Sequence, residues 1–152
     1  SLHAWYGLRD LAALAGREAA LSGRLDLSKL TRLVSLLRSD DGTVDATLRF
    51  RQRRDGWLAI ELEYRGVVEL TCQRCLEPLH HEIGERVELV VADEGAMPAS
   101  APPGFEPYEL TRGRLNPGEL VEDELIVGLP LVPRHERIED CGGSIRGWIE
   151  PY

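Results

Sequence analysis

The sequence predicts an α+β fold, an antiparallel β-sheet of long meander strands flanked by two or three helices. The strongest observation is an alternation of apolar residues over 57–71, which is typical of a half-buried β-strand. Helical spacing of apolar residues over 29–38 and a capped apolar segment at 117–128 predict helices. With 152 residues the chain is long enough for a real hydrophobic core, and we expect one domain over 1–152.

The N-terminal part predicts two helices. Residues 9–15 favour a short helix by intrinsic propensity, and residues 17–23 are ambiguous but compatible with an edge strand. Ser28 is the expected N-cap of a helix over 29–38. The apolar positions of that helix recur at helical spacing: Leu30, Leu33, Val34 and Leu37.

A strand over about 43–53 is expected next, followed by a turn at 54–56 and the strand over 57–71. A two-residue turn would place Phe50 opposite Glu61 and so mix the apolar and solvent faces. A three-residue loop with Gly56 in the left-handed conformation pairs Phe50 with Ile60 instead. We therefore expect the three-residue loop.

The third long strand is predicted over about 79–91. Its apolar residues occupy odd positions, whereas those of the preceding strand occupy even ones, so the connecting loop must have an even length. Pairing Leu70 with Leu79 satisfies this condition and leaves a four-residue tip at 73–76.

The last third of the chain has a different composition. Residues 94–106 are rich in Pro, Gly and Ala and predict a flexible linker, and residues 107–110 are compatible with a short strand. Asn116 is the expected N-cap of the helix over 117–128. The tail at 142–152 is compatible with disorder.

The net charge of −8 argues against a general nucleic-acid binder and suits a basic partner, such as a ribosomal protein. Residues 94–152 carry 5 Arg against 11 Asp and Glu, so the acidity lies mainly in this part. Four acidic residues of the 117–128 helix are candidates for partner binding: Glu119, Glu122, Asp123 and Glu124. No membrane-spanning run or signal peptide is recognisable, and we expect a cytoplasmic protein without a membrane partner.

The strand over 57–71 leads into Cys72-Gln73-Arg74-Cys75. Two thiols at this spacing can bind one metal ion or form a redox pair, and Cys141 and His135 would complete a Cys₃His zinc site. The plainer interpretation is that Cys72 is a small buried apolar residue. Redox catalysis is disfavoured because the pair lies between two strands, without the helix N-terminus that lowers a thiol pKa.

Arginines at alternate positions suggest a second possibility, direct binding of RNA. The candidates are Arg49, Arg51, Arg53, Arg54 and Arg74. The alternative for the strand arginines is a solvated sheet face, partly neutralised by Glu61 and Glu63 across the hairpin.

Two stretches carry a resemblance to a known family. They are Glu69-Leu70-Thr71-Cys72-Gln73-Arg74-Cys75-Leu76-Glu77-Pro78 and the sequence from Val121 to His135, followed by Cys141. Together they resemble the bacterial YceD family, also called DUF177 or large ribosomal RNA subunit accumulation protein.

The resemblance implies a non-enzymatic role in the accumulation of large-subunit (23S) ribosomal RNA, hence in ribosome assembly. A large-subunit ribosomal protein or a pre-ribosomal particle is the implied partner. The residues themselves agree with a non-enzyme, since no phosphate-cradling glycine loop and no serine nucleophile elbow are recognisable. Direct rRNA binding, or a small zinc-binding or redox protein, are the alternatives.

Overall fold

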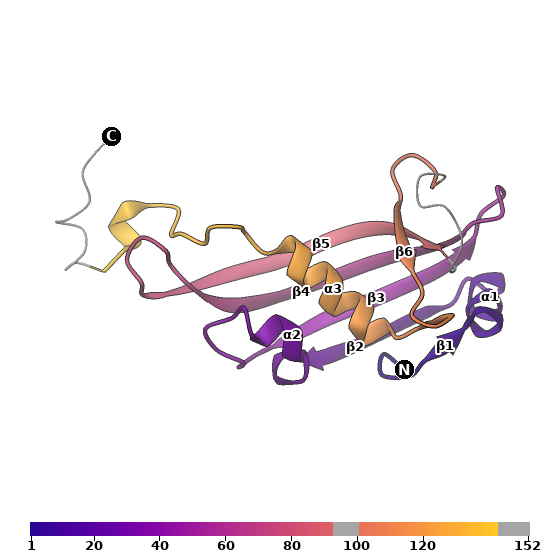
Figure 1. Ribbon diagram of the computed structural model, residues 1–152, viewed down its shortest axis with the longest axis horizontal. Helices are drawn as coiled ribbons and strands as arrows, with labels where there is room; N and C mark the ends of the chain where they lie inside the picture. The colour runs from indigo at the N-terminus through magenta and orange to yellow at the C-terminus, as the bar shows by residue number, and fades with distance from the viewer. Residues whose placement is uncertain (93–100, 143–152) are drawn as a thin grey trace.

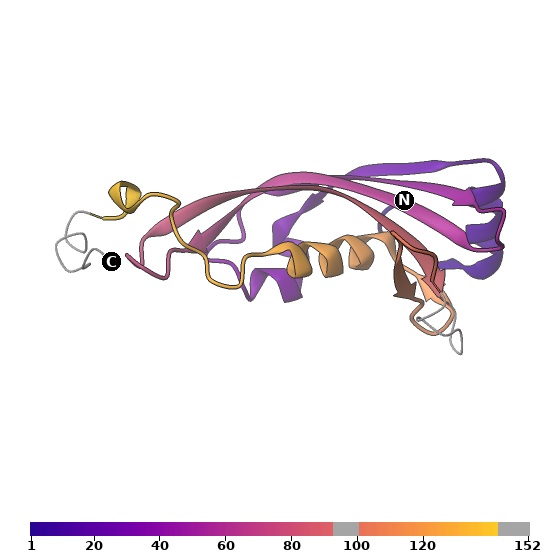
Figure 2. The ribbon, with the colours of Figure 1, turned by 90° about the horizontal axis from the view of Figure 1, so that it is seen from above.

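The computed structural model describes residues 1–92 and 101–142. A curved five-stranded sheet has the strand order β2-β3-β4-β5-β6, and the helices lie on its concave side (Figures 1 and 2). Its strands are β2 (Ala20–Asp26), β3 (Thr43–Gln52), β4 (Leu58–Thr71), β5 (Pro78–Ala92) and β6 (Glu106–Glu109).

The helices are α1 (Leu8–Gly16), α2 (Thr31–Val34) and α3 (Pro117–Gly128). Short 3-10 turns cover Leu27–Lys29 and Ile138–Asp140. Near the N-terminus, β1 (Tyr6–Gly7) pairs with β7 (Arg114–Leu115) in a separate two-stranded sheet. One hydrophobic core joins the concave face of the main sheet to the helices; its members include Leu11, Leu33, Phe50, Ile60, Leu62, Leu120 and Leu125.

The α+β architecture and both long hairpins agree with the sequence predictions. Phe50 pairs with Ile60, and Gly56 has a φ of +94°, as the three-residue loop requires. Leu70 pairs with Leu79, which leaves the expected tip at 73–76. The predicted helices over 9–15 and 117–128 are present, and the ambiguous segment at 17–23 enters edge strand β2.

The prediction of a helix over 29–38 is wrong in length, and Ser28 is not its N-cap. Only Thr31–Val34 forms an α-helical turn, and its start is capped from another helix. The carboxylate of Glu122 in α3 accepts hydrogen bonds from the backbone N–H groups of Arg32 and Leu33, at 2.9 and 3.1 Å. Further along, the backbone N–H of Arg38 donates to the carbonyl of Glu69 at 2.8 Å, which ties this segment to the sheet.

The predicted linker at 94–106 overlaps the following strand by one residue. Residues 93–100 lie outside the described residues, but Glu106 already begins β6, which runs parallel to the end of β5. Phe105 lies beneath the guanidinium groups of Arg51 and Arg53, 5.7 and 4.4 Å from the ring centre. This contact joins Phe105, a residue of the predicted linker, to the first long hairpin. Of the tail predicted at 142–152, only Gly142 is described.

Candidate metal centre

The tip between β4 and β5 places two thiols at one end of the sheet. Strand β4 delivers Cys72 in its buried register, and the tip folds back on it. The backbone N–H of Leu76 donates to the carbonyl of Cys72 at 2.8 Å, and that of Cys72 donates to the carbonyl of Glu77 at 3.0 Å. Both Cys72 and Cys75 are buried. The reverse turn therefore brings the second thiol back beside the first.

The segment after α3 returns to this tip, as Figure 1 shows. Pro130 ends the helical run, and the segment as far as Cys141 contains no secondary structure except the turn Ile138–Asp140. The backbone N–H of Gln73 donates to the carbonyl of Pro133 at 2.8 Å and joins the two segments. His135 and Cys141 thereby reach the two thiols of the tip.

The four predicted ligands meet in one cluster. The ligand atoms of Cys72, Cys75, His135 and Cys141 all lie within 4.8 Å of one another. Nδ1 of His135 is 3.5 Å from Sγ of Cys75 and 3.7 Å from Sγ of Cys141. A tetrahedral zinc with bonds of about 2.3 Å to sulfur and about 2.0 Å to nitrogen separates such ligands by about 3.5 Å. The cluster could therefore bind a metal ion.

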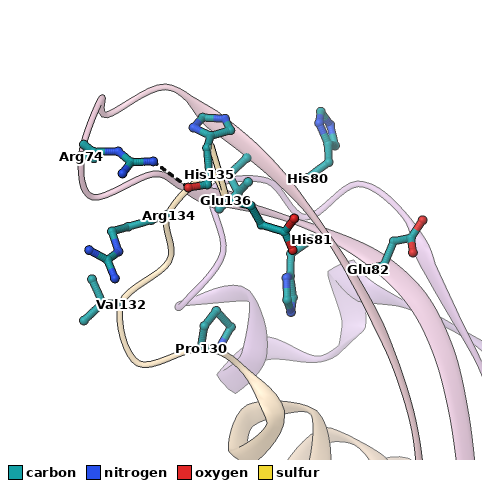
Figure 3. A pocket seen from close by; sticks show the side chains of 10 residues that line it. Arg74, His80, His81, Glu82, Pro130, Val132, Arg134, His135 and Glu136 are labelled. Atoms are coloured by element: carbon teal, nitrogen blue, oxygen red, sulfur yellow. Dashed lines mark hydrogen bonds between the residues drawn. The ribbon is translucent and has the colours of Figure 1, made fainter. Parts of the chain in front are cut away.

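Arg74, a candidate for RNA binding, instead contacts two residues of the cluster. Its Nε donates to Sγ of Cys141 at 3.3 Å. Its Nη2 donates to the carbonyl of His135 at 2.7 Å, as Figure 3 shows. The contact with Cys141 raises the pKa of the Arg74 guanidinium. Sequence reasoning missed this role, although the position of Arg74 between the two cysteines was a signal for it.

The surroundings also set the ionisation of the thiols. Burial acts against the thiolate of Cys72, but hydrogen bonds from the backbone N–H groups of Cys75, His135 and Arg74 outweigh it and lower the pKa to about 6. Burial raises the pKa of Cys141, against the opposing influence of Arg74. The thiolate is the form of cysteine that binds metal ions. The lowered pKa therefore favours the metal-binding form of Cys72 near neutral pH.

A cleft of about 720 Å³ lies beside the cluster, between the start of β5 and the segment 130–136. Figure 3 shows His80 and His81 pointing to opposite sides of β5. Neither belongs to the Cys72 cluster. His80 and His81 therefore line the cleft but are not part of the candidate metal centre, whereas His135 belongs to both.

The acidic residues of α3 differ in how deeply they are buried. Glu122 is buried, at 6% exposure, and its carboxylate bonds to the backbone and side chain of Arg32. Asp123 pairs with Arg32 at 2.6 Å and accepts from the hydroxyl of Tyr108 at 3.0 Å. The prediction that Glu122 faces a partner is therefore wrong, because it holds α2 against α3. Glu119 is exposed, and Asp123 and Glu124 are half-buried. For these three residues partner binding stays a prediction.

The arginines of the first hairpin form pairs on the convex face of the sheet. Arg49 lies 3.4 Å from Glu61 and 3.5 Å from Glu63. Arg51 lies 3.6 Å from Glu88, and Arg53 lies 2.8 Å from Asp55. Arg74 is on the other hairpin, at the opposite end of the sheet (Figure 1). The five arginines proposed for RNA binding, Arg54 included, therefore do not form one surface.

A family model described as "Large ribosomal RNA subunit accumulation protein YceD" matches residues 60–148, a span that contains all four residues of the cluster. A search of the solved structures found none that matches. No helix among the described residues is long and apolar enough to cross a membrane. With more than half of its length matched, the chain belongs to the YceD family, whose name assigns it a role in the accumulation of large-subunit ribosomal RNA.

Proposed function

We propose that this chain is a non-enzymatic assembly factor of the large ribosomal subunit, acting in the cytoplasm through a ribosomal protein or an assembly intermediate. The observation that carries the proposal is the family match over residues 60–148. Accumulation of 23S rRNA then depends on a protein–protein contact that the factor makes while the subunit assembles.

The charge distribution supports a protein partner over direct contact with RNA. The chain carries a net charge of −8, which phosphate repels. The strand arginines that could offset this repulsion are themselves paired with carboxylates. A basic ribosomal protein is attracted by the same charge, so the acidity favours the protein-mediated mechanism.

We further propose that the cluster of Cys72, Cys75, His135 and Cys141 binds a structural zinc ion. Three buried thiols and one imidazole are a closed ligand set, whereas catalytic zinc keeps a position for water. Three thiolates on Zn²⁺ leave one negative charge, which the guanidinium of Arg74 offsets. When bound, the ion would join the β4–β5 tip to the segment after α3.

Purification of the tagged full-length protein from cells, followed by analysis of the associated rRNA and proteins, tests the assembly role. We expect large-subunit precursors to co-purify at low salt and to be released as salt rises, because the contact is electrostatic. Absence of large-subunit components at every salt concentration would reject the proposal. If purified protein-free 23S rRNA binds the chain as tightly as the precursor does, direct RNA binding replaces the protein-mediated mechanism.

A further inference from the structure

Most of the outer edge of β5 has no neighbouring strand among the described residues. Strand β4 pairs along β5 from Pro78 to Val90, whereas β6 pairs on the other side only with the segment Leu89–Ala92. Within residues 1–92 and 101–142, no strand pairs with the outer edge from Pro78 to Glu88. Figure 1 shows this edge between the segment after α3 and β6. Such an edge presents backbone donors and acceptors to any additional strand.

Carboxylates gather on the concave side of this edge. Glu85 lies on β5 opposite Tyr64, and Glu106 begins β6 opposite Leu89. The charges of both act on Glu124 of α3. Burial, and then repulsion by Glu106 and other nearby carboxylates, raises the pKa of Glu124 to about 7.

None of these three carboxylates forms an ion pair with any residue that the structure describes. This differs from the convex side, where Arg86 and Arg51 lie close to Glu61 and Glu88, at 3.5 and 3.6 Å. The three carboxylates on the concave side therefore lie without an ion-pair partner among the described residues.

The start of the edge is accessible from the cleft beside the metal centre. Residues 79–82 of β5 form one wall of the cleft, and the segment 130–136 forms the other. Figure 3 shows His81 pointing toward Pro130 on the concave side, while His80 points away on the other. An extended chain on the β5 edge could continue into this cleft.

We propose that the edge of β5 from Pro78 to Glu88 accepts an extended, Lys- and Arg-bearing segment of a partner protein as an additional strand. Its backbone forms hydrogen bonds with β5, and its basic side chains on one face meet Glu85, Glu106 and Glu124. Side chains alternate between faces in a strand, so a segment with a basic residue at every second position fits. The inference rests on the proposed function in that the partner is taken to be a basic protein.

The test uses the full-length, zinc-loaded chain and a synthetic peptide of alternating Lys and Val, about ten residues long. We expect binding by titration calorimetry together with slower hydrogen exchange at β5 amides between Pro78 and Glu88. Glu85→Lys should weaken binding about tenfold, since it replaces attraction by repulsion at the edge. Glu18→Lys is the matched control: this exposed residue precedes β2 at the opposite side of the sheet, and affinity should not change.

Three outcomes would overturn the inference. The first is equal binding of the same peptide N-methylated at alternate residues, which shows attraction by charge without strand addition. The second is full protection of the edge amides before peptide is added, which shows that the chain covers its own edge. The third is unchanged affinity in Glu85→Lys; Glu106→Lys, another exposed position, repeats the comparison if Glu85→Lys does not fold.

The same variants separate this inference from the proposed function. If Glu85→Lys co-purifies with large-subunit precursors as well as the unchanged protein does, the edge is not the contact and the assembly role stands. If the unchanged protein recovers no precursors, the assembly role fails, while the peptide titration still reports on the edge.

Discussion

Arg74 donates its Nε to Sγ of Cys141 at 3.3 Å, across 67 residues of sequence. This contact lies between the β4–β5 tip and the end of the returning segment, so one side chain joins both halves of the cluster. A guanidinium beside a thiolate also offsets the excess negative charge of a Cys₃His zinc site. Arg74 therefore contacts the candidate metal centre from outside its four candidate ligands.

Arg74→Gln should lower zinc affinity about tenfold or more, because groups that contact metal ligands commonly have effects of this size. Competition with a coloured chelator on the purified protein measures the change. Arg54→Gln, an exposed arginine of the other hairpin, is the matched control and should leave the affinity as it was. Equal zinc affinities in the two variants would show that Arg74 has no influence on the site.

Removal of the metal should loosen the returning segment and leave the sheet folded. The three cysteines form a small cluster with Leu79, separate from the main core between the sheet and the helices. After chelation, or in Cys141→Ser, we expect faster hydrogen exchange at Gln73 and across 134–141. The β3–β4 ladder should keep its protection. Collapse of protection throughout β3 and β4 would show that the metal is needed for the whole fold.

The long hairpins could be predicted because period-2 alternation fixes which strand face is buried. Only one loop length then matches Phe50 with Ile60 and Leu70 with Leu79. The cluster could be predicted in part, since the tip presents Cys72 and Cys75, and His135 and Cys141 are ligand types on the returning segment. The sequence alone could not show that the segment after α3 reaches the β4–β5 tip.

Other features depend on contacts that no local pattern encodes. The short α2 is set by the carboxylate of Glu122, which lies 90 residues from Arg32 in the sequence. Strand β6 is held by parallel pairing with β5, although the residues just before it, 101–105, include two Pro and one Gly. In both cases tertiary structure overrides propensity and composition.

Glu122→Ala should destabilise the fold by about 2 kcal/mol, because it removes the cap of α2 and leaves backbone N–H groups without their acceptor. Urea unfolding followed by circular dichroism measures this. Glu119→Ala, one turn earlier on α3 and exposed, is the control and should stay within about 0.5 kcal/mol of the unchanged protein. A loss below about 0.5 kcal/mol in Glu122→Ala would mean that water replaces the carboxylate at little cost.

Glu124 should make stability depend on pH. Its pKa is about 7 in the folded chain against 4.5 ordinarily, so between these values the folded state binds a proton that the unfolded state lacks. The stability contributed by this protonation is complete below about pH 4.5 and is lost as pH rises through about 7. Charged Glu124 then remains beside other carboxylates at higher pH, which costs free energy.

Glu124→Gln removes that titration. We expect the variant to be more stable than the unchanged protein by about 1 to 2 kcal/mol at pH 8, a discounted value because Glu124 is only half-buried. The difference should shrink toward zero near pH 5. Urea unfolding at both pH values measures it, and taking the difference between the proteins cancels any effect of pH on metal binding. Glu119→Gln, on the same helix, is the control and should unfold with the same free energy as the unchanged protein at both pH values. If Glu124→Gln differs in stability from the unchanged protein by the same amount at pH 5 and pH 8, titration of Glu124 is excluded as the cause.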